Sequence, residues 1–194
     1  MLWLRKPSGV IIANLMQAQA PLDFSYPAVG ASAGQPPAGY IVDHTRINLG
    51  RGERVFKAAR AALERWDHMR LGWLEASAPG PPTYAGQVVA TLARSLGLWW
   101  LNVCRVVYVV EVNGPVEQFG FAYGTLPAHL ACGEERFAVE WDRASDAVCY
   151  DISAFSRPRH LLARLGYPWM RMVQKRFGRD SARALARAVE RSVS

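Results

Sequence analysis

Five consecutive segments rich in branched and aromatic residues, followed by one long helical segment, most constrain how this chain can fold. The five segments, whose composition is typical of β-strands, are residues 86–93, 98–112, 118–125, 134–141 and 148–155. Turn-forming residues at 113–115 and 142–146 join two pairs of these segments and favour antiparallel hairpins over crossover connections. The pattern therefore predicts an antiparallel β-meander.

The remaining elements complete an α+β fold. Residues 40–49 are expected to form a first strand, and residues 53–66 a helix with apolar residues at helical spacing. Helical sequence begins again after Pro158, with a kink or break expected at Gly166 and Pro168, and residues 168–191 form the longest predicted helix. We expect a curved sheet of about six strands wrapped around this C-terminal helix, a helix-grip-like arrangement that commonly encloses a cavity.

The N-terminal residues differ from the rest of the chain. We expect residues 1–39 to form a helix and an irregular arm packed on a single domain of residues 40–194, because prolines and glycines crowd the segment 21–39. The apolar run at 10–16 resembles a secretion signal, but it is short and Asn14 interrupts it, which favours an amphipathic helix. No stretch approaches the ~20 apolar residues that a transmembrane helix requires.

The cysteines and the missing motifs exclude several kinds of site. Cys104, Cys132 and Cys149 form neither a CxxC pair nor a zinc-binding cluster, and their odd number argues against a disulfide framework. This use of cysteine is typical of the reducing cytoplasm. The chain has no dinucleotide-binding, phosphate-loop, serine-hydrolase or HExxH motif. We therefore expect no cofactor and no metal, and the sequence does not indicate a reaction.

Positive charge is concentrated near the C-terminus. The chain has a formal net charge of +7, whereas residues 156–194 alone carry ten Arg or Lys residues and two acids. Six of these bases recur every fourth residue: Arg171, Lys175, Arg179, Arg183, Arg187 and Arg191. A basic helix of this kind can bind nucleic acid or an anionic membrane, but without interleaved aromatic residues it is more typical of a solvated face.

Several motifs together resemble a known family. The sequences FGFAYGTLP at 119–127, GEERF at 133–137, VEW at 139–141 and AFSRP at 154–158 closely resemble the signature of uncharacterised protein family 0548. The chain departs from that signature at Ala128 and Leu130. The resemblance covers residues 26 to 189 and implies a fold similar to the helix-grip, lipid-transfer-like class of the birch pollen allergens, but it implies no function.

Two residues are candidates for proton transfer. Strand alternation places Glu135 on the same face as Phe137, Val139 and Trp141, so its carboxyl is expected to face inward with a raised pKa. Pairing with an arginine at the start of the strand is the structural alternative. His129, in the loop before this strand, is either a catalytic group at a pocket mouth or a structural histidine.

Arg105, Tyr123 and Tyr150 are candidate polar anchors for a ligand, together with Glu135. Arg105 lies in an apolar strand and needs a counter-charge, either from an acid such as Glu111 or Glu135 or from a ligand. Three hypotheses follow. The first is binding of a small apolar or amphipathic molecule, the second a small-molecule enzyme using Glu135 and His129, and the third an interaction or nucleic-acid module using the basic helix.

Overall fold

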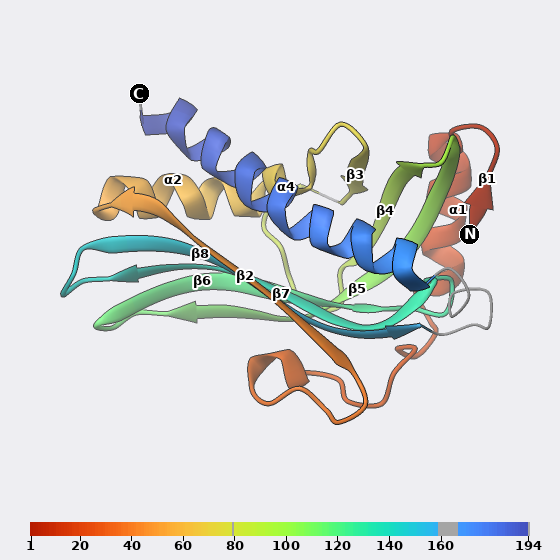
Figure 1. Cartoon of the computed structure of the whole chain (residues 1–194), viewed down its shortest axis with the longest axis horizontal. Coiled ribbons are helices and arrows are strands. Elements are labelled where there is room, and N and C mark those ends of the chain that lie inside the picture. Colours follow the sequence, from red (N-terminus) through yellow and green to blue (C-terminus); the bar gives the residue numbers. More distant parts are fainter. Residues whose placement is uncertain (79, 159–166, 194) are drawn as a thin grey trace.

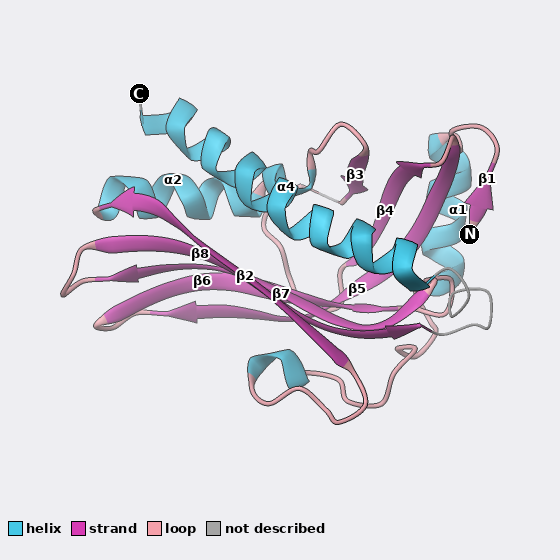
Figure 2. Cartoon of the chain, viewed as in Figure 1, coloured by secondary structure: helices cyan, strands magenta, loops and turns pink. Residues whose placement is uncertain are grey.

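The protein contains a strongly curved antiparallel sheet with its longest helix on its concave face (Figures 1 and 2). The computed structural model describes residues 1–78, 80–158 and 167–193. Its strands are β1 (Leu2–Trp3), β2 (Ile41–Arg51), β3 (Leu74–Ser77), β4 (Val88–Ser95), β5 (Leu98–Val112), β6 (Val116–Thr125), β7 (Ala131–Asp142) and β8 (Ala147–Pro158). The strand order is β2-β8-β7-β6-β5-β4-β3, and β1 pairs with β5.

The predicted meander is confirmed, but the predicted number of strands is too small. The sheet has eight strands in the described part of the chain rather than about six. The two unpredicted strands, β1 and β3, are two and four residues long. Segments this short show too little period-two alternation to be recognised from sequence.

The helices are α1 (Gly9–Gln19), α2 (Glu53–Glu64) and α4 (Tyr167–Val193), with short 3-10 turns η1 (Ala31–Ala33) and η2 (Asp67–Met69). Helix α4 crosses the concave face of the sheet, which confirms the helix-grip arrangement (Figure 1). Pro168 lies in its first turn, where a missing backbone N–H is tolerated. The predicted helix start after Pro158 and the predicted kink at Gly166 lie outside the described residues. None of the described helices has the length and apolar character to span a membrane.

The two halves of α4 have different surroundings. Its C-terminal half packs with α2 against one end of the sheet, in a core that includes Phe56, Leu63, Trp141, Leu185 and Val189. All five side chains are buried. Because this core fills one end of the concavity, only the N-terminal half of α4 is left to cover a hollow.

The irregular arm after α1 lies on the convex face of the sheet (Figure 1). Tyr26 is buried against Phe155 and Cys132 there. The contact is close, because a Cβ atom added to Gly124 of β6 would lie 2.0 Å from the Tyr26 hydroxyl. Glycine at position 124 therefore allows the arm to rest directly on the strand.

Candidate functional site

A cavity of about 830 Å³ lies between the concave face of the sheet and the N-terminal half of α4. This volume is in the range of small-molecule sites. Strands β5 to β8 contribute Asn102, Tyr123, Glu135, Ile152 and Ala154 to its lining, and α4 contributes Trp169, Met170, Val173 and Phe177. These four helix residues present mainly apolar surface, and polar groups come both from the sheet and from Gln174, Lys175 and Arg179 of the helix.

Glu135 and Tyr123 form the central polar pair of the cavity. They are register partners on neighbouring strands, and the Tyr123 hydroxyl donates a hydrogen bond of 2.9 Å to the Glu135 carboxyl. Burial raises the pKa of Glu135 to about 7; the hydrogen bond from Tyr123 opposes this rise, and the nearby charge of Asp43 adds to it. Near neutral pH, the Glu135 carboxyl can therefore either hold or release a proton.

A set of polar contacts fixes the N-terminal half of α4 over the cavity. Arg171 binds the carboxylate of Asp43 on β2 through both terminal guanidinium nitrogens. Gln174, which accepts a hydrogen bond from Arg171, donates one of 2.9 Å from Nε2 to the Ser156 hydroxyl on β8. We call these four residues the helix clasp. It joins the helix to the two strands at one edge of the sheet.

Two further contacts set the position of α4. Trp73 Nε1 donates a hydrogen bond of 2.9 Å to Asp180, and the guanidinium of Arg176 lies 4.5 Å from the centre of a Trp73 ring. Near the middle of the helix, a Cβ atom on Gly178 would lie 2.8 Å from Thr45 Oγ1. The helix thus approaches β2 more closely than any residue with a side chain would allow without movement.

His129 lines the same cavity but does not pair with Glu135. Its Nδ1 atom lies 3.0 Å from the carbonyl oxygen and 3.1 Å from the amide nitrogen of Ala131. Burial lowers the pKa of His129 to about 4, so the ring is neutral at physiological pH. The structure brings both proton-transfer candidates to one cavity, without a hydrogen bond between them.

Arg105 and Tyr150 lie outside the cavity lining. The guanidinium of Arg105 donates hydrogen bonds to the carbonyl oxygens of Ala20 (2.5 Å) and Leu22 (2.8 Å), so backbone carbonyls of the arm surround it in place of the expected acid or ligand. The side chain of Tyr150 is fully buried, and its hydroxyl lies 3.2 Å from that of Ser181 in α4. We therefore remove both residues from the set of ligand anchors.

A β-bulge places Arg105 and Val109 on opposite faces of the sheet. Strict alternation places Arg105 on the same face as Val109, but the register between β5 and β6 shifts between Val106 and Tyr108. Val109 consequently packs against the concave core together with Val106, whereas Arg105 contacts the arm. A bulge of this kind has no clear signature in the sequence.

Sequence reasoning missed the role of Glu134. This side chain is only 2% exposed and faces the arm, where it accepts hydrogen bonds from the Tyr26 hydroxyl (2.6 Å) and from the backbone N–H groups of Gly30 (2.8 Å) and Ser32 (3.0 Å). The Ser32 hydroxyl donates another. Alternation predicts the direction of Glu134, but it does not reveal that residues more than 100 positions away cover it.

Sequence reasoning also missed a buried histidine. His68 in η2 is fully buried, with its ring 4.7 Å from that of Phe137 and 5.6 Å from that of Trp66, measured between ring centres. Neither ring nitrogen has a hydrogen-bond partner in the described part of the protein. Burial lowers the pKa of His68 to about 3, so the side chain is neutral and part of the aromatic core.

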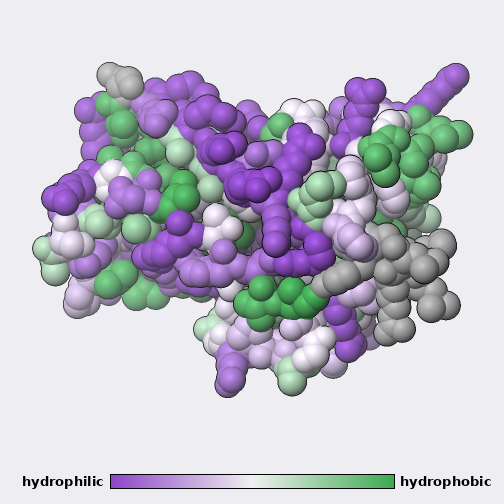
Figure 3. Space-filling view, viewed as in Figure 1, coloured by the Kyte–Doolittle hydropathy of each residue, from purple (hydrophilic) through white to green (hydrophobic). Residues whose placement is uncertain are grey.

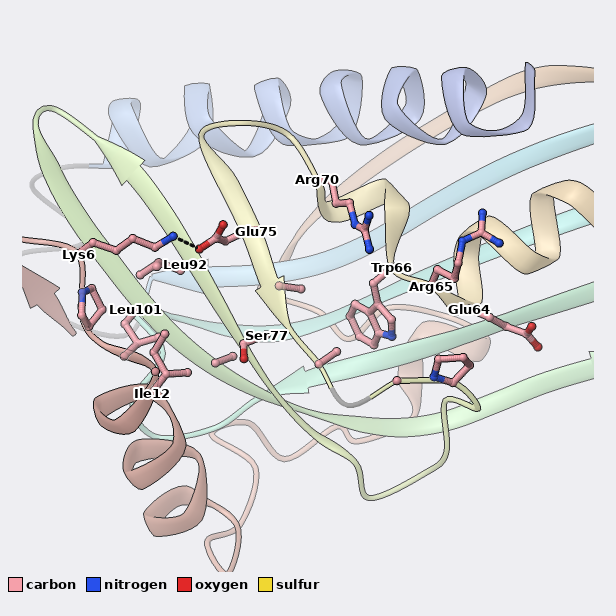
Figure 4. A pocket seen from close by; sticks show the side chains of 17 residues that line it. Lys6, Ile12, Glu64, Arg65, Trp66, Arg70, Glu75, Ser77, Leu92 and Leu101 are labelled. Atoms are coloured by element: carbon pink, nitrogen blue, oxygen red, sulfur yellow. Dashed lines mark ion pairs between the residues drawn. The ribbon is translucent and has the colours of Figure 1, made fainter. Parts of the chain in front are cut away.

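A second pocket, of about 670 Å³, lies between α1, the β3–β4 hairpin and the end of α2 (Figure 4). Lys6 and Glu75 form an ion pair of 2.6 Å at one side of it. Arg65 and Arg70 also line it, and both pair with Asp67. Its charges are thus largely neutralised by one another. Within the described residues, no cluster of three His, Cys, Asp or Glu side chains is arranged to hold a metal ion.

The curved sheet, the long covering helix and the cavity between them define a helix-grip protein. Solved structures share this fold: the protein TTHA0849 from Thermus thermophilus (TM-score 0.53, 9% identity, 80% of this chain and 99% of that one) and a norcoclaurine synthase point mutant from Thalictrum (TM-score 0.52, 10% identity, 82% and 100%). At this level of identity the likeness concerns the fold alone.

Sequence comparison gives the family. The family model described as "Domain of unknown function (DUF1990)" matches residues 25–184. A UPF0548 protein of Dictyostelium discoideum is 37% identical over 159 residues (77% of this chain, 73% of that protein), and one of Deinococcus radiodurans is 36% identical over 203 aligned positions (97% and 98%). The chain belongs to this family of UPF0548 proteins with the DUF1990 domain, as the motifs at 119–127 and 133–137 indicate.

Proposed function

We propose that the protein binds a small apolar or amphipathic molecule in the cavity between the sheet and α4, with Tyr123 and Glu135 as the polar anchors. The observation that carries this proposal is the 830 Å³ cavity, whose walls combine aromatic and aliphatic side chains with the hydrogen-bonded pair of Tyr123 and Glu135. Ligand sites characteristically combine apolar walls with a few convergent polar groups. The Thalictrum norcoclaurine synthase is described as a complex with a transition state analogue, which supports small-molecule binding in this fold.

The affinity would come mainly from the apolar walls. Each methylene group that moves from water into such a cavity contributes roughly 0.8 kcal/mol. Ile152 and Ala154 on β8 face Val173 and Phe177 from α4 across this space. Each added CH2 group of a ligand should therefore strengthen binding by severalfold until the cavity is full.

Filling the cavity tests this proposal. We expect Ala154→Phe to reduce binding of the neutral fluorescent dye N-phenyl-1-naphthylamine at least tenfold, because the new ring occupies space beside Glu135. The matched control is Ser153→Phe, which adds the same ring on the convex face of the same strand. Dye fluorescence titrations at equal protein concentration measure both variants.

Equal loss of dye binding in the two variants would show that the ring acts through general destabilisation. Unchanged binding in Ala154→Phe would place the dye elsewhere, for example in the pocket of Figure 4. The second result contradicts a ligand site between β8 and α4.

A second candidate function is proton transfer on a bound carbonyl compound, and the pKa of Glu135 near 7 favours it. In this reaction the Glu135 carboxylate removes a proton from the carbon next to the carbonyl and later returns one. His129, held by the backbone of Ala131, would not be the base. We expect the protein to accelerate deuterium incorporation into 2-decanone in D2O, measured by NMR, and Glu135→Gln to lose this effect. Equal rates with and without protein would exclude this function.

We also propose that the protein works in a reducing compartment such as the cytoplasm. Cys104, Cys132 and Cys149 are free, and the first two are buried as small apolar side chains. Buried free cysteines are typical of proteins that are not exposed to oxidising conditions.

A further inference from the structure

The charges around Glu135 are unbalanced. Four titratable groups lie close enough to its carboxylate to interact with it electrostatically: Tyr123 on β6, Cys104 on β5, Tyr150 on β8 and Asp43 on β2. All four are acids, so none is positive at any pH. Within the described residues, the one hydrogen bond to the Glu135 carboxyl comes from Tyr123, and no Lys, Arg or His forms an ion pair with it.

The basic residues on the cavity wall are committed elsewhere or lie at its open side. Arg171 is held by Asp43 in the helix clasp. Lys175 and Arg179 are exposed on α4. His129 is neutral at physiological pH because burial lowers its pKa to about 4. Within residues 1–78, 80–158 and 167–193, no cationic side chain therefore pairs with the Glu135 carboxylate, although a buried carboxylate needs a counter-charge.

We propose that the cavity selects ligands whose polar end is a cationic amine, with the ammonium group bound to Glu135 and the apolar remainder lying between β8 and α4. This inference rests on the proposed ligand-binding function. The ammonium group would donate to the Glu135 carboxylate beside the ring of Tyr123. Aromatic faces also attract ammonium groups that are shielded from water. A carboxylate ligand would instead meet like charge at this position.

Binding of an amine at Glu135 must be linked to proton release. Since the pKa of Glu135 is about 7, much of the free protein carries a proton on this group at neutral pH, and an ammonium ion displaces it. Amine affinity should therefore rise by about 30-fold between pH 5.5 and pH 8, as expected for one group with this pKa. A neutral ligand of the same length should show much weaker pH dependence.

The test compares three ligands with the same alkyl chain: n-decylamine, 1-decanol and decanoate. Each displaces N-phenyl-1-naphthylamine from the full-length protein at pH 8, and the competition gives relative affinities. We expect the amine to bind at least tenfold more tightly than the alcohol, and decanoate to bind most weakly. In Glu135→Gln the difference between amine and alcohol should disappear, together with the pH dependence of amine binding.

Glu140→Gln is the matched control, because Glu140 lies on the same strand but on the convex face, where it binds Arg46. This variant should keep the amine preference. Equal affinities for amine and alcohol in the wild-type protein, or an amine preference that survives in Glu135→Gln, would overturn the inference while leaving ligand binding intact. If the dye and all three ligands fail to bind, the proposed function itself is contradicted.

Discussion

The buried carboxyl of Glu135 makes the stability of the protein depend on pH. The pKa of this carboxyl is about 7 in the folded protein, whereas its ordinary value is 4.5, so folding favours the protonated form. This contribution to stability is complete below pH 4.5 and is lost as the pH rises through 7. A side chain that costs stability at neutral pH yet lines a cavity is a typical feature of a functional site.

Replacing Glu135 with Gln should therefore change how stability varies with pH. Between pH 5 and pH 8, we expect wild-type protein to lose about 2 to 3 kcal/mol relative to Glu135→Gln, because only the wild type must ionise this buried group. Urea unfolding at the two pH values measures the difference. Parallel pH profiles would mean that the carboxyl is solvated or paired with a cation.

At the residue scale, strand alternation predicted side-chain direction correctly in β7 but not across the bulge in β5, and it predicted the surroundings of side chains poorly. It placed Glu135 inward, as the structure has it. It did not reveal that Tyr150 is enclosed by α4, or that Arg105 contacts the arm, because both depend on segments distant in sequence. Side-chain direction follows from local geometry, whereas partners follow from tertiary packing.

At the element scale, the position of α4 depends on its close approach to β2. Alanine at position 178 would place its Cβ atom 2.8 Å from Thr45 Oγ1. In a helix interior, a change from Gly to Ala normally stabilises by roughly 1 kcal/mol. When Thr45 is present, we expect Gly178→Ala not to increase the free energy of unfolding. When Thr45 is replaced by Ala, we expect the same change to stabilise the protein by roughly 1 kcal/mol.

Thermal or urea unfolding of the four proteins in this double-mutant cycle gives the coupling energy between positions 45 and 178. A coupling of about 1 kcal/mol or more is expected for side chains in direct contact. Additive effects would show that α4 does not rest on Thr45. Helix α4 would then cover the cavity from a different position.

The long elements were predictable from sequence and the short or irregular ones were not. The six longer strands, with α1, α2 and most of α4, follow from periodicity and composition. Strands β1 and β3 are too short to show a period, and they form because β5 and β4 offer unpaired edges to them. The arm contains no repeating pattern, although it contributes donors to the buried carboxylate of Glu134.

At the scale of the whole molecule, one end of the sheet is filled and the other is hollow. The outer surface of α4 is hydrophilic (Figure 3). Two of its basic side chains have partners within the protein, since Arg171 binds Asp43 and Arg176 binds Asp180. Through Arg171, the basic helix thus takes part in closing the cavity. We interpret its other arginines as part of a solvated outer face.

The central claim is that the hollow between β8 and the N-terminal half of α4 holds a ligand. Nuclear Overhauser effects between n-decylamine and methyl groups of the protein test it most directly. We predict contacts from the alkyl chain to Ile152 and Val173, which lie on opposite walls of the cavity. Contacts to Ile12 and Leu92, which line the other pocket, or the absence of any contact at saturating amine, would contradict the account.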